Sequence, residues 1–309
     1  MRIFNSIEEY AKTGYQSRVA LGFFDGVHLG HRAVIHEIVA DKGGDRAVVL
    51  TFRESPAKLL SEEDVPLITD NRRKAELMDE LGVDAVIFAD FGQIKETDAE
   101  DFVRGVLVRQ LRAKKVSCGY NYRFGKGGKG DIATLERLCG ELGIGLSVCQ
   151  PVDCGGQAVS SSAVRELLQS GRIADANRML GSAYSVRGRI DSGNHIGTTM
   201  GFPTVNLAIE NGLVVPKRGV YASRVTIGSE CYRGATNIGV HPTVGENETP
   251  LCETFLLDYR GEELRGEYAV CEPVAFIRDE KKFVSVDALT EQISRDIEAI
   301  KKVMDAGNP

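Results

Sequence analysis

Two histidines three residues apart, His28 and His31, stand where an apolar run ends and a helix is expected to begin. This spacing puts both imidazoles on one face of the helix. The free backbone N–H groups and the positive dipole end of the helix point the same way, which is an arrangement that binds phosphate. Gly26 and Gly30 lack a Cβ, so a ligand can approach the backbone closely. The segment VALGFFDGVHLGH (19–31) therefore predicts a binding site for a nucleotide triphosphate.

Two plainer interpretations of the histidines are a zinc pair and a capped helix without a ligand. A zinc site needs further Cys or His ligands at suitable spacing, and no such cluster follows nearby. The stretch GFFDGVHLGH (22–31) resembles instead the HxGH signature of the nucleotidylyltransferase superfamily, and most closely its flavin-adenylylating branch. The resemblance implies a Rossmann-like domain that binds ATP. It assigns nucleotide and phosphate binding to Gly22, Phe24, Asp25, Gly26 and Gly30.

The composition favours a two-domain protein of the cytoplasm. The 309 residues exceed what most single hydrophobic cores hold. A formal net charge of −6, without a dense run of Lys or Arg, argues against a nucleic-acid partner. The 7 cysteines include no C-x-x-C pair and the N-terminal stretch has no apolar signal core, which predicts reduced thiols. No apolar run reaches membrane-spanning length, so no membrane partner is expected.

Short apolar runs alternate with helical patterns from residue 17 to about 151. This alternation predicts a parallel sheet covered by helices on both faces. Ligands bind beyond the carboxyl ends of such strands, and the Asp25-Gly26 turn lies at one of those ends. The expected strands are 18–23, 47–51, 85–89, 115–118 and 146–150, and the expected helices lie near 29–40, 70–81, 98–112 and 131–142.

After Tyr184 the pattern changes to short β-branched runs punctuated by glycine, which predicts a small antiparallel β-barrel. We therefore expect an α/β domain at 1–183 and a barrel domain at 184–309 that ends in a long amphipathic helix. Ser285 is placed to cap this helix. The expected strands of this half are 185–190, 219–225, 232–238 and 253–259, and the apolar helix positions, at steps of three and four, are Val286, Leu289, Ile293, Ile297, Ile300 and Met304.

Three serines lead into an expected helix in the segment VSSSAVRELL (159–168), with an arginine one turn further on. Taken alone, this pattern is a good helix N-cap. Beside GFFDGVHLGH it resembles the second phosphate motif of the superfamily, ISSTxxR. The resemblance implies that Ser161, Ser162 and Arg165 hold the outgoing pyrophosphate.

Residues 119–131 (GYNYRFGKGGKGD) follow another expected strand. Asn121 and Arg123 match the flavin-adenylyltransferase motif of the family as nucleotide or flavin-phosphate contacts, and Lys126–Gly130 predicts a mobile turn. Attack of a phosphate oxygen on the α-phosphorus of ATP spreads negative charge over the nonbridging oxygens, so catalysis is mostly positioning and charge stabilisation. Histidine N–H groups, helix amides, an arginine and a divalent metal supply this stabilisation without a covalent nucleophile.

The C-terminal half opens with a glycine-rich stretch, GRIDSGNHIGTTMGFPTVNL (188–207), and the chain contains no Walker-type phosphate loop. Thr204 and Asn206 are two residues apart, so both side chains leave the same face of a strand and one metal ion could contact both. GFPTVN resembles the PTAN-type motif of riboflavin kinase, which implies that Thr204 and Asn206 bind Mg²⁺ and the nucleotide phosphates. The glycines whose amides are expected to face the phosphates are Gly193, Gly197 and Gly201.

Three later segments also resemble the flavokinase barrel: GVYAS (219–223), ATNIGVHPTVG (235–245) and CETFLLDY (252–259). The resemblance aligns Glu253 with the catalytic glutamate. A carboxylate is a suitable base for a primary ribityl hydroxyl that attacks the γ-phosphate. The alternative interpretation of Glu253 is an ordinary glutamate at a strand edge.

Together these segments resemble the bifunctional bacterial riboflavin kinase/FAD synthetase family over nearly the whole chain. The resemblance implies that riboflavin and ATP give FMN, and that FMN and ATP give FAD and pyrophosphate. Ser55, Thr198 and Arg265 lie where the chain departs from the family pattern, and no histidine role is carried over to Ser55. The alternatives are another HxGH adenylyltransferase with an unrelated second domain and a non-catalytic flavin-sensing protein. The sequence does not indicate the oligomeric state.

Overall fold

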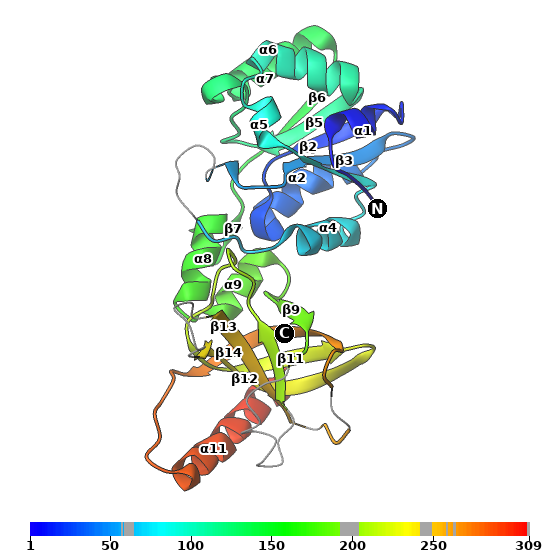
Figure 1. Ribbon diagram of the computed structural model, residues 1–309. Helices are drawn as coiled ribbons and strands as arrows, with labels where there is room; N and C mark the ends of the chain where they lie inside the picture. The colour runs from blue at the N-terminus through cyan, green and yellow to red at the C-terminus, as the bar shows by residue number, and fades with distance from the viewer. Residues whose placement is uncertain are drawn as a thin grey trace. The chain divides into compact units, whose positions relative to one another are not determined.

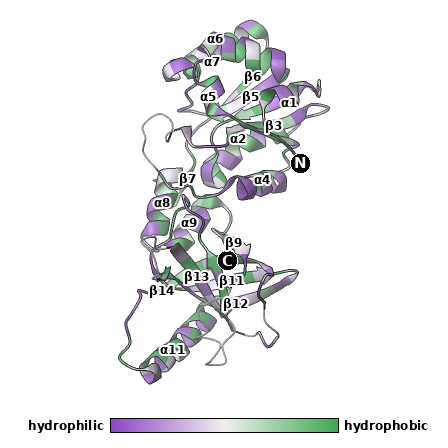
Figure 2. Cartoon of the chain, viewed as in Figure 1, coloured by the Kyte–Doolittle hydropathy of each residue, from purple (hydrophilic) through white to green (hydrophobic). Residues whose placement is uncertain are grey.

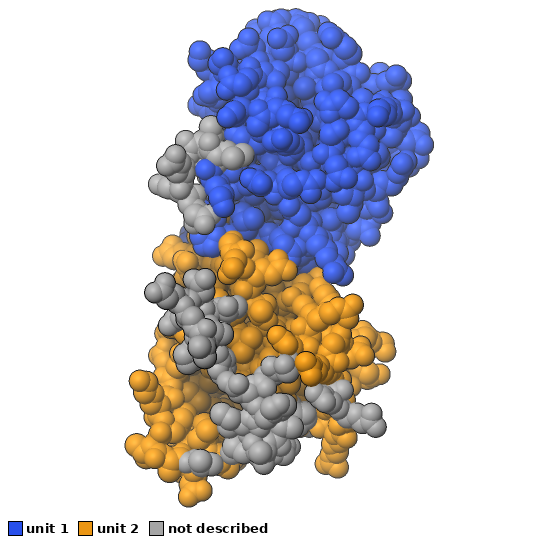
Figure 3. All heavy atoms as spheres, in the orientation of Figure 1, with its two compact units in different colours: residues 1–161 blue, residues 162–309 orange. Residues whose placement is uncertain are grey.

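The computed structural model describes residues 1–56, 58, 65–191, 204–241, 249–257, 259–261 and 264–307. They form two compact units, Met1–Ser161 and Ser162–Pro309 (Figure 3). The boundary between the units falls at the first residue of helix α8 (Ser161–Gln169).

The first unit contains a six-stranded parallel sheet in the order β1-β4-β3-β2-β5-β6 (Figure 1). The chain reverses its direction of sheet growth between β2 and β5, so these neighbouring strands form the switch point at which ligands bind in open α/β sheets. The strands are β1 (Arg2–Phe4), β2 (Ser17–Leu21), β3 (Arg46–Phe52), β4 (Ala85–Ala89), β5 (Ala113–Gly119) and β6 (Gly145–Cys149), and a small hairpin of β7 (Asp153–Cys154) and β8 (Gln157–Ala158) follows.

Both faces of this sheet are buried. On β3, Val48 and Leu50 belong to one hydrophobic cluster, whereas Val49 belongs to the other, as the alternation of side chains along a strand requires. This arrangement confirms the predicted α/β sheet covered on both sides. The first cluster is completed by α1 (Ile7–Ala11), η2 (Phe102–Gln110) and α7 (Ile132–Leu142), and the second by α2 (Leu29–Val39) and α4 (Asn71–Glu80).

Several elements differ from the expectation. The expected helix at 98–112 is a short helix, α6 (Ala99–Asp101), that continues as the π-helix η2, and hydrophobic periodicity does not separate the two forms. Strand β1 is too short for a periodic pattern, and it is held by parallel pairing with β4. Other short elements were also not expected: α1, the β7–β8 hairpin, α5 (Phe91–Ile94) and the 3₁₀ turns η1 (Asp25–Val27) and η3 (Lys126–Gly128).

The second unit contains a six-stranded antiparallel sheet in the order β10-β13-β12-β11-β14-β9. A bridge between Asp191 and Asn206, with a 3.0 Å hydrogen bond from Asp191 N to Asn206 O, joins the two edges and nearly closes a barrel. This confirms the predicted barrel. Its strands are β9 (Val186–Arg189), β10 (Thr204–Ala208), β11 (Gly219–Ile227), β12 (Glu230–His241), β13 (Thr249–Leu256) and β14 (Tyr268–Arg278), of which β14 was not predicted and β13 begins and ends earlier than expected.

The barrel interior is filled by side chains. Val205, Cys252 and Thr254 are fully buried and alternate along their strands with less buried residues. Thr236 Oγ1 lies 2.9 Å from Thr254 Oγ1, and each of these atoms lies 3.5 Å from Cys271 Sγ. The interior is therefore a packed core with a small polar centre.

Helix α11 (Val286–Asp305) covers part of the outer barrel surface. Ser285 caps it as predicted, because its side chain accepts a 3.2 Å hydrogen bond from Ala288 N. The predicted apolar face is confirmed at Ile300, which is fully buried in a cluster with Val220 and Val274. The same face includes Asp296, whose carboxylate forms a bidentate ion pair with Arg278 of β14.

Helices α8 and α9 (Ile173–Leu180) belong to the second unit, N-terminal to the predicted domain boundary at 183/184. Asn177 joins α9 to the barrel, because its Nδ2 donates to Pro273 O at 3.0 Å and its Oδ1 accepts from Tyr184 N at 2.8 Å. The Leu168 carbonyl accepts a 2.9 Å hydrogen bond from Lys217 N. The division of the chain at 183/184 stays a prediction about which pieces fold and work alone.

We expect a fragment that starts at Ser162 to be more stable than one that starts at Tyr184, because only the longer fragment keeps Asn177 and the apolar side of α9. The two hydrogen bonds of Asn177 alone are worth about 1 kcal/mol each, which corresponds to a melting temperature higher by roughly 5 °C or more. Thermal unfolding of both fragments measures this difference. Asn177→Ala in the longer fragment should reproduce part of it, and equal melting temperatures would contradict the prediction.

Candidate active sites

A strained turn follows β2 in the first unit. Phe24 has φ of 57° and Val27 has φ of 44°, and both values lie in the left-handed region that non-glycine residues rarely adopt. Gly22 leaves room for the Phe24 ring, because a Cβ there would lie 3.0 Å from this ring, which is a tight contact. Asp25 holds the turn: its buried Oδ1 accepts hydrogen bonds from Ile68 N at 2.9 Å and from Thr69 N at 3.3 Å.

His28 and His31 lie directly after this turn, at the start of α2. Their rings are stacked with centroids 3.5 Å apart and an angle of 15° between the planes. His28 is the N-cap of the helix, and its Nδ1 accepts a 3.3 Å hydrogen bond from His31 N. Because Nδ1 is the acceptor, we place the ring proton of His28 on Nε2, where it can be donated to a ligand. Gly30 makes room for this ring, since a Cβ would lie 3.2 Å from two of its atoms.

Both histidines are neutral at pH 7. Burial lowers the pKa of His28 to about 4. Burial also lowers the pKa of His31 well below its ordinary value, and the neighbouring His28 and Lys74 lower it further. The buried Nδ1 of His31 has no hydrogen-bond partner among the residues that the structure describes. The pair can therefore donate and accept hydrogen bonds without carrying a net charge.

The serine motif reaches the same turn through Ser161. Ser161 Oγ donates a 3.0 Å hydrogen bond to the carbonyl of Asp25. Ser162 and Arg165 follow on α8, in the second unit. The structure thus brings Ser161 together with the predicted phosphate-binding turn within one unit.

Asn121 and Arg123 lie in the loop after β5, the strand beside β2 in the sheet. Both side chains are exposed, and Arg123 Nη1 lies 3.8 Å from Asp131 Oδ2. The segment that was predicted to be a mobile turn contains η3 and is closed by paired backbone hydrogen bonds between Phe124 and Gly130. Both predicted contact residues therefore lie beyond the carboxyl end of β5, at the switch point.

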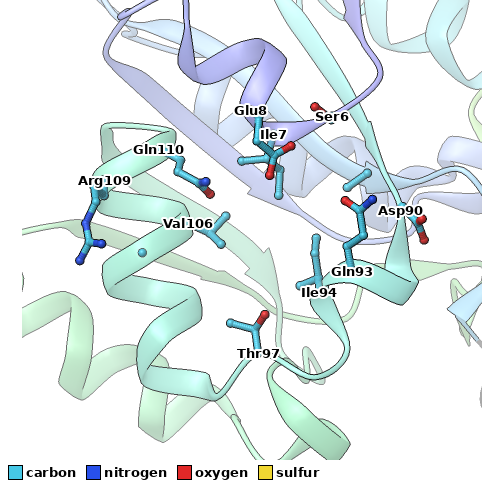
Figure 4. A pocket seen from close by; sticks show the side chains of 12 residues that line it. Ser6, Ile7, Glu8, Asp90, Gln93, Ile94, Thr97, Val106, Arg109 and Gln110 are labelled. Atoms are coloured by element: carbon cyan, nitrogen blue, oxygen red, sulfur yellow. The ribbon is translucent and has the colours of Figure 1, made fainter.

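A cavity of about 290 Å³ lies elsewhere in the first unit, between α1, α5 and η2 (Figure 4). The side chains of Ile7, Ile94 and Val106 point into it, with Gln93 and Gln110 at its polar side. No predicted site residue lines this cavity.

In the second unit, the strand register places Asn206 of β10 opposite Glu253 of β13, and Glu253 opposite Asn237 of β12. Residues paired in this way point to the same face of a sheet. The face is the outer one, because their neighbours Val205 and Thr254 fill the interior. Glu253 is half-buried, as is Thr204 on the same face.

This outer row offers oxygen ligands of the kind that Mg²⁺ prefers. Asn206 is 3 % exposed, and its Oδ1 has no hydrogen-bond partner among the described residues, which is unfavourable unless a ligand binds it. The Thr204 hydroxyl lies on the same face and the Glu253 carboxylate is directly opposite. Thr204 and Asn206 therefore fit a magnesium–nucleotide complex, beside the carboxylate of Glu253. Gly193, Gly197, Gly201 and Thr198 lie outside the described residues.

Two members of this neighbourhood were missed by the sequence analysis. Asn237 extends the row, and it lies within the quoted segment ATNIGVHPTVG, so its alternation with Thr236 could have indicated it. Glu280 comes from the loop after β14, and a Cβ at Gly239 would meet its carboxylate and the amide of Asn237. Only the tertiary structure brings Glu280 close to Gly239, so the sequence carries no signal for it. The described residues contain no group of three or more His, Cys, Asp or Glu side chains that could hold a metal ion.

A neutral histidine pair at a helix start on a parallel sheet, and an outer row of acid and amide side chains on a barrel, define a nucleotide-dependent transferase with two sites. The family models agree with this division. The model described as FAD synthetase matches residues 11–163, and the model described as riboflavin kinase matches residues 180–304.

Curated relatives carry both activities in their names. The bifunctional riboflavin kinase/FMN adenylyltransferase of Listeria monocytogenes is 34% identical over 90% of this chain and 89% of its own length, and that of Bacillus subtilis is 34% identical over 94% and 92%. The Escherichia coli protein of the same name is 34% identical over 96% of each chain. The chain belongs to the bifunctional riboflavin kinase/FMN adenylyltransferase family, and it is an enzyme with these two activities.

A solved structure shares the fold over the full length. A crystal structure described as a macrolide-efflux protein from Streptococcus pneumoniae superposes with a TM-score of 0.87, at 28% identity, over 97% of this chain and 98% of that one. In the present chain, no helix among the described residues is long and apolar enough to cross a membrane.

The lowered pKa of His28 makes the stability of the first unit depend on pH. Between the folded value of about 4 and the ordinary value of 6.5, the unfolded chain binds more protons than the folded one, so stability is lost as the pH falls through this window. The loss is on the order of 3 kcal/mol. His28→Asn keeps a capping acceptor but does not titrate. As the pH falls, the free energy of unfolding of the wild-type protein should therefore decrease by this amount more than that of the variant.

Chemical unfolding at about pH 7, 5.5 and 4.5 measures the effect. His36→Asn, at an exposed position of the same helix, is the control and should follow the wild-type pH profile. Parallel profiles for His28→Asn and wild-type protein would show that His28 is not held neutral by the fold.

Proposed function

We propose that each reaction is carried by the residue set of one half of the chain: FMN adenylylation by the turn at 22–31 with the motif at 161–165, and riboflavin phosphorylation by the outer row of the barrel. The proposal assigns residues 1–183 to the adenylyltransferase and 184–309 to the kinase. The observation that supports it best is that the stacked histidine pair and the Asn206–Glu253 pair belong to different compact units. The free cysteines of the chain support our placement of the enzyme in the cytoplasm.

In adenylyl transfer, a phosphate oxygen of FMN attacks the α-phosphorus of ATP, a new P–O–P bridge forms and pyrophosphate leaves. We assign to His28 Nε2–H and to the first amides of α2 the hydrogen bonds to oxygens that gain charge in the transition state. Because burial lowers the pKa of His28 to about 4, the ring is neutral at pH 7, and its one N–H acts as a hydrogen-bond donor without adding a positive charge. Ser161, Ser162 and Arg165 receive the pyrophosphate, and Asn121 and Arg123 contact the nucleotide or the flavin phosphate.

In the kinase reaction, Glu253 accepts the proton of the ribityl hydroxyl as that oxygen attacks the γ-phosphorus of ATP and ADP leaves. Thr204 and Asn206 would hold Mg²⁺, which neutralises phosphate charge when bound. The amides of the loop that contains Gly193, Gly197 and Gly201 would bind the phosphates. A strand-edge glutamate without a catalytic role is the alternative for Glu253, and the kinase activity of Glu253→Gln separates the two.

The double variant His28→Ala/His31→Ala should lose FAD formation and keep FMN formation, because two hydrogen-bonding groups disappear from one site only. Loss of a single transition-state donor typically costs about 10²- to 10³-fold in rate. Chromatography of riboflavin incubated with ATP and Mg²⁺ measures both products at once. Equal loss of both activities would contradict separate sites, and unchanged riboflavin with the wild-type protein would favour a flavin sensor without catalysis.

Glu253→Gln keeps the shape of the side chain and removes the base, so FMN formation should fall by roughly 10²- to 10⁴-fold. FMN added from outside should still become FAD, because that reaction uses the other half. Riboflavin and Mg-ATP binding should change little, since the role lies in the chemical step. Kinase turnover within about threefold of wild type would show that Glu253 is only a structural strand residue. Glu230→Gln, at the far end of β12, is the matched control.

A further inference from the structure

Lys74 is fully buried, at 0 % exposure, in helix α4. The helix is largely hydrophilic along its length (Figure 2), so burial of this lysine is not a consequence of an apolar sequence. Lysine is almost never fully buried unless its charge is paired, because removal of an ammonium group from water is costly. The position of Lys74 therefore requires an explanation.

The Lys74 ammonium has no hydrogen-bond partner within the described part of the chain. Its Nζ lies 4.0 Å from the centroid of the Phe23 ring, in the segment that leads into the strained turn. Asp25 and Asp70 act on it electrostatically, but one oxygen of each already accepts backbone hydrogen bonds, from Ile68 and Thr69 and from Arg73 respectively. The ammonium group of Lys74 therefore makes a cation–π contact with the Phe23 ring.

The charge is retained at neutral pH and acts on the histidine pair. Burial lowers the pKa of Lys74 to about 8, so most molecules keep the proton at pH 7. Its positive charge is one of the influences that keep His31 neutral. Since His28 and His31 supply hydrogen bonds but no net charge, attraction of a polyphosphate must come from other groups. Arg32 is another cation near the turn, and its Nε donates to Val27 O at 3.1 Å.

We propose that Lys74 is a positioning residue for adenylyl transfer: a fixed positive charge behind the turn at 22–31 that attracts the phosphates of ATP and of the outgoing pyrophosphate. This inference rests on the proposed function of the histidine site. In a partly desolvated setting, such a charge is weakly screened and acts over several ångströms. The charge acts through the turn, and the ammonium itself does not touch the reacting atoms.

The test uses the full-length protein with Lys74→Met, which matches the shape without the charge, and Lys74→Arg, which keeps the charge. FAD formation from added FMN is measured, together with the reverse reaction, in which pyrophosphate attacks the adenylyl phosphorus of FAD and FMN leaves. The reverse reaction involves the adenylyl site alone. Lys42→Met is the matched control, because Lys42 pairs with Asp84 at the opposite end of the strands.

For Lys74→Met we expect KM for ATP and for pyrophosphate to rise about tenfold or more, while KM for FMN and the kinase activity change less than about threefold. Lys74→Arg should recover most of the affinity, and Lys42→Met should behave as wild type. The melting temperature of Lys74→Met should not fall, because replacement of an unpaired buried charge by an apolar group is neutral or stabilising.

Unchanged KM values for ATP and pyrophosphate in Lys74→Met would overturn the proposal. A lower melting temperature with equal increases in the KM of all three substrates would also overturn it, by showing a structural role. The proposed function fails separately, if His28→Ala/His31→Ala retains FAD formation. If that double variant forms no FAD while Lys74→Met has wild-type KM values, the proposed function is supported and the inference about Lys74 is wrong.

Discussion

The carboxylate of Asp25 holds the backbone conformation on which the first site depends. Phe24 and Val27 adopt left-handed φ values that cost on the order of 1–3 kcal/mol each, so the turn persists only where other contacts fix it. Hydrogen bonds from Ile68 and Thr69 to Asp25 provide that constraint from a segment more than 40 residues away. The placement of His28 and the hydrogen bond of Ser161 both follow from this turn.

The first site separates hydrogen bonding from charge. A charged histidine pair at 3.5 Å would repel itself and would bind water or any anion strongly, whereas a buried neutral pair presents directional groups at little electrostatic cost. Charge can then be supplied from behind the turn, where it is not competed for by solvent. This arrangement suits the adenylyl transfer that we propose for the histidine site, because pyrophosphate must leave after it has been stabilised.

The sequence predicted those features that depend on local patterns. The apolar runs located β2 to β6, and the serine before the last helix located its cap, because burial alternation and capping are short-range properties. Asp25 was expected among the phosphate contacts. In the structure its carboxylate also accepts hydrogen bonds from the backbone N–H groups of residues 68 and 69. Lys74 lies in NRRKAELMDE, which has the composition of a surface helix, and its burial arises only when α4 packs against the turn. Glu280 and Asn237 both lie close to Gly239 for the same reason, since their sequence separation carries no local signal.

The residues that we propose for the kinase reaction lie on the outer face of a barrel whose interior is filled by side chains. Thr236, Thr254 and Cys271 are in mutual contact at its centre. A substitution in the outer row changes the proposed kinase site, whereas a substitution in the interior changes the packing of the barrel. The two sets of positions alternate along the same strands, one residue apart. Substitutions can therefore change the melting temperature of this half and its turnover as two nearly independent properties, although the positions concerned alternate along the same strands.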